Sequence, residues 1–119
     1  MTKEQALHNF WSSFGWKAYD ETSVPDEAQL PRITYEVSTD SFGHEVAQTA
    51  SLWMRKTGWK EISDKADEIE RAITKGGKML AYTGGALWIK CGSPWAQRMA
   101  DDDDTLRRIV LNVSVEFVD

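Results

Sequence analysis

The first hydrophobic pattern along the chain has the spacing of an α-helix. Its apolar stripe consists of Leu7, Phe10, Trp11 and Phe14. Residues at this spacing share one face of a helix and can pack it against a core. Thr2 and Gln5 precede the stripe at the spacing of a capping box, in which the hydroxyl caps the helix and the amide reaches back. We therefore expect an N-terminal helix with Gly15 as its C-terminal cap.

A connector follows over Tyr19–Pro31. It contains two prolines and four acidic residues and shows no periodicity, which is typical of a loop. The preceding helix is too short to be a domain of its own. We therefore expect an ordered surface loop rather than a linker between domains.

Alternation of apolar and polar residues then predicts an antiparallel hairpin. Its first strand is Arg32–Asp40, its turn is Ser41–His44 and its second strand is Glu45–Arg55. The faces predicted to be buried carry Ile33, Tyr35, Val37, Val46, Ala50, Leu52 and Met54. Trp53 falls on the opposite face, with the polar residues of the second strand.

The second helix is predicted over Trp59–Lys75. Its apolar stripe, which steps by four, three and four residues, is Ile62, Ala66, Ile69 and Ile73. Glu61–Lys65 and Asp67–Arg71 place an acid four residues before a base on the outer surface, and such pairs add about 0.2–0.5 kcal/mol each. Gly76-Gly77 is expected to end the helix.

The remaining pattern predicts three strands. Lys78–Tyr82 and Ala86–Lys90 form a hairpin around a glycine-containing turn. Gly92–Pro94 breaks the pattern, and Trp95–Asp104 is expected to be a loop or a short helical turn. The last and longest strand is Arg107–Val118. Its buried face consists of Leu111, Val113, Val115 and Phe117.

The order helix, two strands, helix, three strands predicts an α+β fold. We expect a mostly antiparallel sheet of four to five strands backed by two helices on one face. The length of 119 residues and the lack of an internal repeat predict a single domain over residues 1–119.

Composition narrows the classes of function. The chain is 41% hydrophobic and 28% charged, as in soluble globular proteins. The longest stretch without a charge, Met79–Ile89, has eleven residues, whereas a membrane helix needs about 20, so we expect neither a membrane span nor a secretory signal. A net charge of −5 argues against a dedicated nucleic-acid binder. Cys91 is the single cysteine, which excludes an internal disulfide and fits a reducing compartment.

The sequence offers little for catalysis. His8, His44 and Cys91 show no spacing typical of a metal site or a nucleophile with its base. The run Asp101–Asp104 could bind a hard cation, but it lacks the spaced acids and the glycine of a calcium loop. Repulsion between like charges favours an exposed, solvated loop, and a second interpretation is an acidic surface beside a channel. We expect no enzymatic activity, no cofactor and no metal site.

Tryptophan is unusually frequent, with six residues in 119. Large aromatic side chains fill cores, and tryptophan is also enriched at the energetic centres of protein interfaces. The candidate interface residues are Trp53, Trp59, Trp88, Trp95, Arg98 and Met99. For each tryptophan, burial in the core of its own chain is an equally weighted alternative.

Four stretches of the chain stand out by their order and spacing. They are VPDEAQLPRITYEV at Val24–Val37, SLWMRKTGWKEISDKADEIERAI at Ser51–Ile73, GGALWIKCGSPWAQRMADDDD at Gly84–Asp104 and RRIVLNVSVEF at Arg107–Phe117. Together they resemble the tail-terminator (tail-completion, or minor tail) proteins of bacteriophages with long non-contractile tails. The stretches are short and carry no catalytic signature, so no family residue is transferred to this chain.

The resemblance implies a sheet backed by helices and a structural role in the virion. Family members form a ring, typically a hexamer, that caps the head-proximal end of the tail tube, stops tube polymerisation and joins tail to head. The implied partners are further copies of the chain, the tail tube protein and the head–tail connector protein. DNA only passes through the lumen, where Asp101–Asp104 would form a repelling wall. The hairpin tip Asp40–Glu45 or the loop Gly92–Asp104 would reach the tube or the neighbouring subunit. The implied location is the head–tail junction of the virion, after synthesis in the host bacterial cytoplasm.

Three alternatives stay open. The chain could be a head-side connector, stopper or minor capsid protein, which would dock on the portal complex. It could be a small metal-dependent hydrolase that uses Asp101–Asp104 with Mg²⁺. It could also be a cytosolic adaptor domain that binds a host partner through its tryptophan-rich surface.

Overall fold

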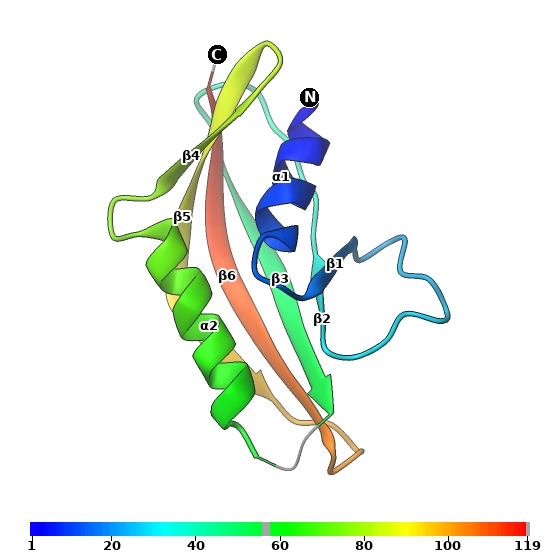
Figure 1. Ribbon diagram of the computed structural model, residues 1–119. Coiled ribbons are helices and arrows are strands. Elements are labelled where there is room, and N and C mark those ends of the chain that lie inside the picture. Colours follow the sequence, from blue (N-terminus) through cyan, green and yellow to red (C-terminus); the bar gives the residue numbers. More distant parts are fainter. Residues whose placement is uncertain (56–57, 119) are drawn as a thin grey trace.

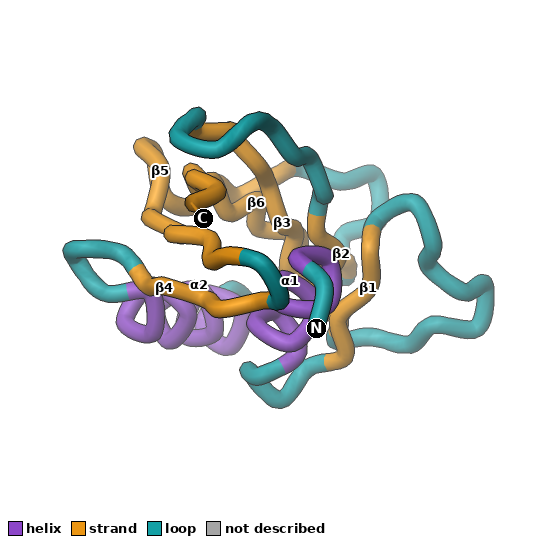
Figure 2. The backbone as a smooth tube through the Cα atoms, turned by 90° about the horizontal axis from the view of Figure 1, so that it is seen from above, coloured by secondary structure: helices purple, strands orange, loops and turns teal. Residues whose placement is uncertain are grey.

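The computed structural model describes residues 1–55 and 58–118. Both helices lie on one face of a curled sheet whose strands run in the order β1-β2-β3-β6-β5-β4 (Figures 1 and 2). The elements, in chain order, are α1 (Lys3–Ser12), β1 (Lys17–Asp20), β2 (Arg32–Tyr35), β3 (Glu45–Arg55), α2 (Lys60–Ile73), β4 (Lys78–Tyr82), β5 (Gly85–Met99) and β6 (Leu106–Val118).

The pairing confirms the predicted α+β fold with a mostly antiparallel sheet. β1 runs parallel to β2, and every other neighbouring pair of described strands is antiparallel. β3 pairs with β6 along its whole length, from Glu45 opposite Glu116 to Arg55 opposite Leu106. The sheet has six strands, where the sequence predicted four to five.

The N-terminal helix begins as predicted and ends earlier. Thr2 Oγ1 accepts a hydrogen bond from the Gln5 backbone at 3.1 Å, and the Gln5 side chain accepts one from the Thr2 backbone at 2.8 Å, so the capping box is confirmed. The C-terminal cap is Ser13 rather than Gly15. Gly15 adopts a φ of 85° two residues later, where the chain reverses toward β1.

The second helix buries the predicted stripe, with Ile62, Ile69 and Ile73 fully enclosed. Trp59 is its N-terminal cap residue and Thr74, with a φ of 67°, is its C-terminal cap. The prediction that Gly76-Gly77 ends the helix is therefore wrong by two residues. Ile73 completes the buried stripe, and the chain leaves the helix directly after it.

Two strand boundaries differ from the prediction near the connector. β1 covers Tyr19 and Asp20, which the sequence assigned to a loop, because these residues pair with β2 rather than showing an alternation of their own. β2 ends at Tyr35 instead of Asp40. Beyond it, the Ser38 carbonyl accepts a hydrogen bond from the buried Gln48 side chain, which takes the place of a ladder partner.

The largest correction concerns β5, which continues through the predicted break to Met99. The glycine–proline signal marks a bulge, because Cys91 lies opposite Val113 whereas Ala96 lies opposite Leu111. Asn112 Nδ2 donates to the Pro94 carbonyl at 3.0 Å and holds the bulge against β6. The prediction that Trp95–Asp104 is a loop is wrong for its first half. A long β6 pairs with both halves of β5 and carries the strand past a local irregularity.

The core lies between the sheet and the two helices. Its largest fully enclosed side chains are Trp11, Phe117, Leu7, Ile33, Leu52, Ile62, Ile69, Ile73, Leu87, Ile89, Leu111 and Val115. They come from α1, α2 and all strands except β1 and β4, so the N-terminal and C-terminal segments share one core. In the part of the chain that the structure describes, no helix covers the other face of the sheet.

Candidate interaction surface

At the end of the sheet where β3 stops, Trp53 lies between two arginines. Arg32 on β2 and Arg108 on β6 are its register partners, so the three side chains share the face away from the helices. Their guanidinium carbons lie 5.9 Å and 4.6 Å from the Trp53 ring. The Trp53 indole donates to Thr34 Oγ1 at 3.0 Å, and Arg108 donates to Ser51 Oγ at 3.0 Å. Trp53 is thus half-buried by its own chain.

On the helix side of the same end, Trp59 is held in a similar way. The guanidinium carbons of Arg98 on β5 and Arg107 on β6 lie 4.8 Å and 5.1 Å from its ring. Arg98 lies opposite Ile109 and Arg107 opposite Met54, and both partners are buried under the helices. Such cation–π contacts are worth about 0.5–1 kcal/mol at exposed sites, and they hold the guanidinium groups in fixed positions.

The acidic run Asp101–Asp104 connects β5 to β6 at this same end. Asp103 accepts hydrogen bonds from Arg55 at 2.6 Å and from the backbone and hydroxyl of Thr105 at 2.9 Å and 2.7 Å. These bonds, the one from Arg55 first, hold the pKa of Asp103 well below its usual range. Asp101 in turn accepts from the Asp103 backbone at 2.9 Å. Two of the four carboxylates therefore shape the turn, and the whole run is exposed.

Arginine is the residue that defines this end of the molecule. The chain has six arginines. The five at this end are Arg32, Arg55, Arg98, Arg107 and Arg108, and all of them belong to β2, β3, β5 or β6. Sequence reasoning noted the tryptophans and missed this cluster. The available signal was that one predicted strand ends at Arg55 and another begins at Arg107, but the pairing of these two strands was not predicted.

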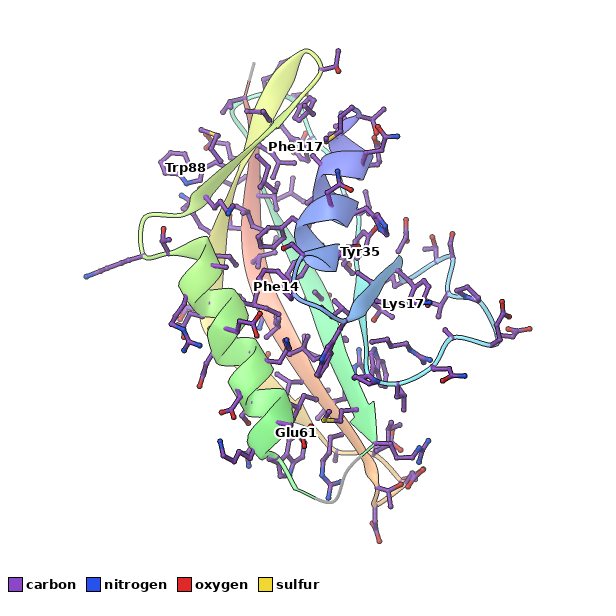
Figure 3. All side chains as sticks on the ribbon, in the orientation of Figure 1. Phe14, Lys17, Tyr35, Glu61, Trp88 and Phe117 are labelled. Atoms are coloured by element: carbon purple, nitrogen blue, oxygen red, sulfur yellow. The ribbon has the colours of Figure 1, made fainter. Side chains whose placement is uncertain are left out.

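The opposite end of the sheet exposes apolar side chains instead. Met79 is 55% exposed and lies opposite Trp88, which is 36% exposed. Figure 3 shows Trp88 on the outside of the β4–β5 hairpin. Its indole donates to the Gly76 carbonyl at 3.0 Å, and the Lys90 ammonium lies 5.1 Å from its ring. Phe42, in the loop before β3, is a further 55% exposed.

An ion pair links the strands close to Trp88. Lys90 and Glu45 are 2.8 Å apart on β5 and β3. Their hydrogen bond lowers the pKa of Glu45 and raises the pKa of Lys90, so both groups stay charged at neutral pH. Because the Lys90 and Glu45 side chains are 38% and 50% exposed, solvent screens the contribution of this pair to stability.

The predicted interface residues thus divide into two groups. Trp53, Trp59, Arg98, Met99 and the run Asp101–Asp104 gather at the arginine-rich end, whereas Trp88 lies at the apolar end. Trp95 is half-buried and packs against the core. Met99 is 40% exposed and Arg98 is exposed. Their interface role stays a prediction. Phe42 lies within the hairpin tip Asp40–Glu45, which was expected to reach the tube or the neighbouring subunit. The exposed Met79 was missed, because a single apolar residue in a short strand carries no pattern.

His8 and Cys91, which were considered for catalysis, lie among side chains of the fold. His8 Nδ1 lies 2.9 Å from the Tyr35 hydroxyl, and burial together with Asp20 raises the pKa of Tyr35. Burial also raises the pKa of the Cys91 thiol, whereas a reactive cysteine needs a lowered one. Over residues 1–55 and 58–118, no three His, Cys, Asp or Glu side chains are grouped to hold a metal ion. No helix in these ranges is long and apolar enough to cross a membrane.

Comparison with known proteins gives a likeness in structure. No protein-family model and no curated protein matches the chain. A chain in the solved virion of a native gene transfer agent particle matches with a TM-score of 0.66 at 17% sequence identity. The match covers 96% of this chain and 90% of that chain. At this identity, the likeness establishes a shared fold over nearly the full length of both chains.

Proposed function

We propose that this chain is a structural protein of a phage or phage-like virion. The observation that carries the proposal is the fold it shares, over 96% of its length, with a chain of a gene transfer agent virion. The sequence stretches that resemble tail-terminator proteins support the same class independently. In this role the chain is not an enzyme, and it works by assembling with other virion proteins.

Within the virion, we propose the role of tail terminator. The chain would form a ring on the head-proximal end of the tail tube, where it stops tube polymerisation and joins tail to head. A ring of identical subunits is held by heterologous contacts, so each subunit needs two different lateral surfaces. The sheet offers such a pair, since β1 forms one edge and β4 with the free half of β5 forms the other.

A terminator also needs two different axial surfaces, one for the tube protein and one for the head connector. The exposed acidic turn Asp101–Asp104 at one end of the sheet and the exposed Phe42 and Met79 at the other differ strongly in chemistry, which supports this division. DNA would pass through the lumen without binding, because a net charge of −5 repels the phosphate backbone. The protein would accordingly be found at the head–tail junction of the virion.

The decisive experiment is electron microscopy of lysates from the parent phage or prophage with this gene inactivated. We expect tails of uncontrolled, excessive length beside unattached heads. Supplying the gene from a plasmid should restore the normal tail length and infectivity. Free tails of normal length would move the role to a head-side connector or stopper, and intact infectious virions would exclude a virion role.

A further inference from the structure

We propose that the acidic connector of one copy docks on the basic edge of a second copy. The acidic connector is the segment 20–27, and the basic edge is the exposed end of β5, namely Gln97, Arg98 and Met99. This contact would be the lateral contact between neighbouring subunits of the proposed ring. The contact itself does not depend on the proposed function, but its repetition into a closed ring does.

The acidic connector projects away from the body of the molecule beside β1 (Figures 1 and 2). It carries four acids, and the whole stretch 19–31 contains no lysine or arginine. Asp20 accepts hydrogen bonds from Thr22 within the segment. The carboxylates of Glu21, Asp26 and Glu27 make no ion pair with any residue that the structure describes, and all three residues are exposed. Three negative charges are therefore available to another molecule.

The basic edge is open because β4 is much shorter than β5. β4 starts at Lys78, opposite Ile89, so β5 has no described strand on its outer side beyond that point. Arg98 is exposed and lies over the Trp59 ring at 4.8 Å. Within the described ranges it has no carboxylate partner. Stacking on an aromatic ring fixes a guanidinium without neutralising its charge, so this edge presents an unpaired cation in a set position.

The two surfaces cannot meet within one chain. The strand order places β1, with the connector behind it, at one edge of the sheet and β5 with β4 at the other. Contact between them therefore requires a second copy placed head to tail, which is the heterologous geometry that generates rings. Opposite charges at such a contact favour the correct orientation and oppose contact between two identical edges.

Charge reversal of each surface provides the test. The connector variant is Glu21→Lys with Glu27→Lys, and the edge variant is Gln97→Glu with Arg98→Glu. The Gln97→Glu substitution keeps a side-chain oxygen that accepts the hydrogen bond from Asn112 Nδ2. Sedimentation velocity up to about 1 mM protein, at low salt and at 1 M NaCl, would measure self-association. The matched control is Glu4→Lys with Glu70→Lys, which changes the charge by the same amount as the connector variant on exposed helix positions.

We expect the wild-type chain to associate at low salt and to dissociate in 1 M NaCl, where the Debye length is about 3 Å. Each variant alone should associate at least tenfold more weakly, while the control behaves like the wild type. An equimolar mixture of the two variants should recover association, because every reversed surface then meets its opposite in an alternating ring of even number. If circular dichroism shows the edge variant to be unfolded, Arg98→Ala replaces it, with the same loss expected.

Three results would overturn the proposal. They are a wild-type chain that stays monomeric throughout, variants that associate like the wild type, and a mixture that shows no recovery. The gene-inactivation phenotype is a separate readout. If gene inactivation gives excessively long tails and any of these three results is found, the terminator role is retained and this contact is discarded. If the chain associates through these surfaces but gene inactivation leaves normal virions, the contact is retained and the terminator role is discarded.

Discussion

Large side chains at the arginine-rich end of the sheet are packed against other side chains of the same chain, whereas those at the apolar end are more exposed. At the arginine-rich end, Trp53 and Trp59 are half-buried, and two guanidinium groups of the same chain pack against each of them. At the apolar end, Phe42 and Met79 are each 55% exposed. The comparison shows that the number of tryptophans says little about where an interface lies, because a tryptophan can be buried by arginines as well as by a core.

The difference predicts that the large side chains of the arginine-rich end contribute to the stability of the fold, whereas those of the apolar end mainly determine the chemistry of the surface. A side chain enclosed by its own chain contributes to folding, and its loss destabilises the monomer. An exposed side chain contributes little to folding and changes only what the surface presents. Substitutions at the two ends should therefore differ in their effect on the free energy of unfolding.

Trp53→Ala should lower the free energy of unfolding by about 3 kcal/mol, at the lower end of the range for replacing tryptophan by alanine in a core. The substitution removes the ring that Arg32 and Arg108 pack against and leaves the buried Thr34 hydroxyl without its indole donor. Urea unfolding followed by far-UV circular dichroism would measure it. Trp88→Ala is the matched control at the apolar end and should cost less than half as much. Equal losses at the two positions would contradict the division.

Gly77→Ala should destabilise the chain by about 2 kcal/mol, combining a left-handed backbone with a steric clash. Gly77 has a φ of 93°, and a Cβ there would lie 2.1 Å from Trp88 Nε1. Gly84→Ala is a precise control, because Gly84 has the same φ of 93° and no atom within 4 Å of a Cβ. Thermal unfolding of both variants isolates the clash as their difference. If the two melting temperatures agree, Trp88 does not rest on Gly77.

How much of the fold could be predicted depends on whether an element has an apolar pattern of its own or is formed only through its contacts in the tertiary structure. Periodicity located α2, β3 and β6 to within about two residues, because each has a strong apolar stripe that faces the core. It missed β1 and the second half of β5, which are strands only because β2 and β6 pair with them. Backbone pairing is a property of the tertiary fold, and a four-residue strand or a strand with a bulge has no alternation to reveal it.

The residue types at the candidate site could be predicted from the sequence, but their arrangement in space could not. Unusual composition singled out the tryptophans, and two of them do lie with Arg98, Met99 and Asp101–Asp104 at one end of the sheet. The four arginines that pack against them come from three strands, so their meeting depends on register. Register follows from the sheet topology, and a one-residue shift would move these side chains to the other face. The sequence alone therefore could not tell an enclosed tryptophan from an exposed one.

Phe42→Ser and Met79→Ser, singly, should change the free energy of unfolding by less than about 0.5 kcal/mol, as is usual for exposed positions. Both side chains are 55% exposed, so folding gains little from them. Urea unfolding of each variant beside Leu87→Ser, whose side chain is fully buried in the same region, would give the contrast. A loss above 1 kcal/mol at either exposed position would mean that the apolar end is packed.

The smallest effect is expected at the Asp103 turn. Arg55→Met should raise the pKa of Asp103 toward its ordinary value of about 3.9, because the bond from Arg55 is the main cause of its depression. A carboxyl group with a depressed pKa in the folded state stabilises the fold above its unfolded pKa, and this contribution is lost as the pH falls below about 4 through the folded value. The stability of the wild type should thus decline more steeply below pH 4 than that of Arg55→Met.

Urea midpoints measured between pH 2 and pH 7 would test this difference, and carboxyl chemical shifts would follow Asp103 directly. Both groups of the pair are about half exposed, so the effect is small and should shrink further in 1 M salt. Asp102→Asn, which removes a carboxyl from the same loop, is the control and should leave the pH profile unchanged. If Asp102→Asn and Asp103→Asn flatten the profile equally, the loop responds to its total charge, and the specific bond to Arg55 is not its stabilising contact.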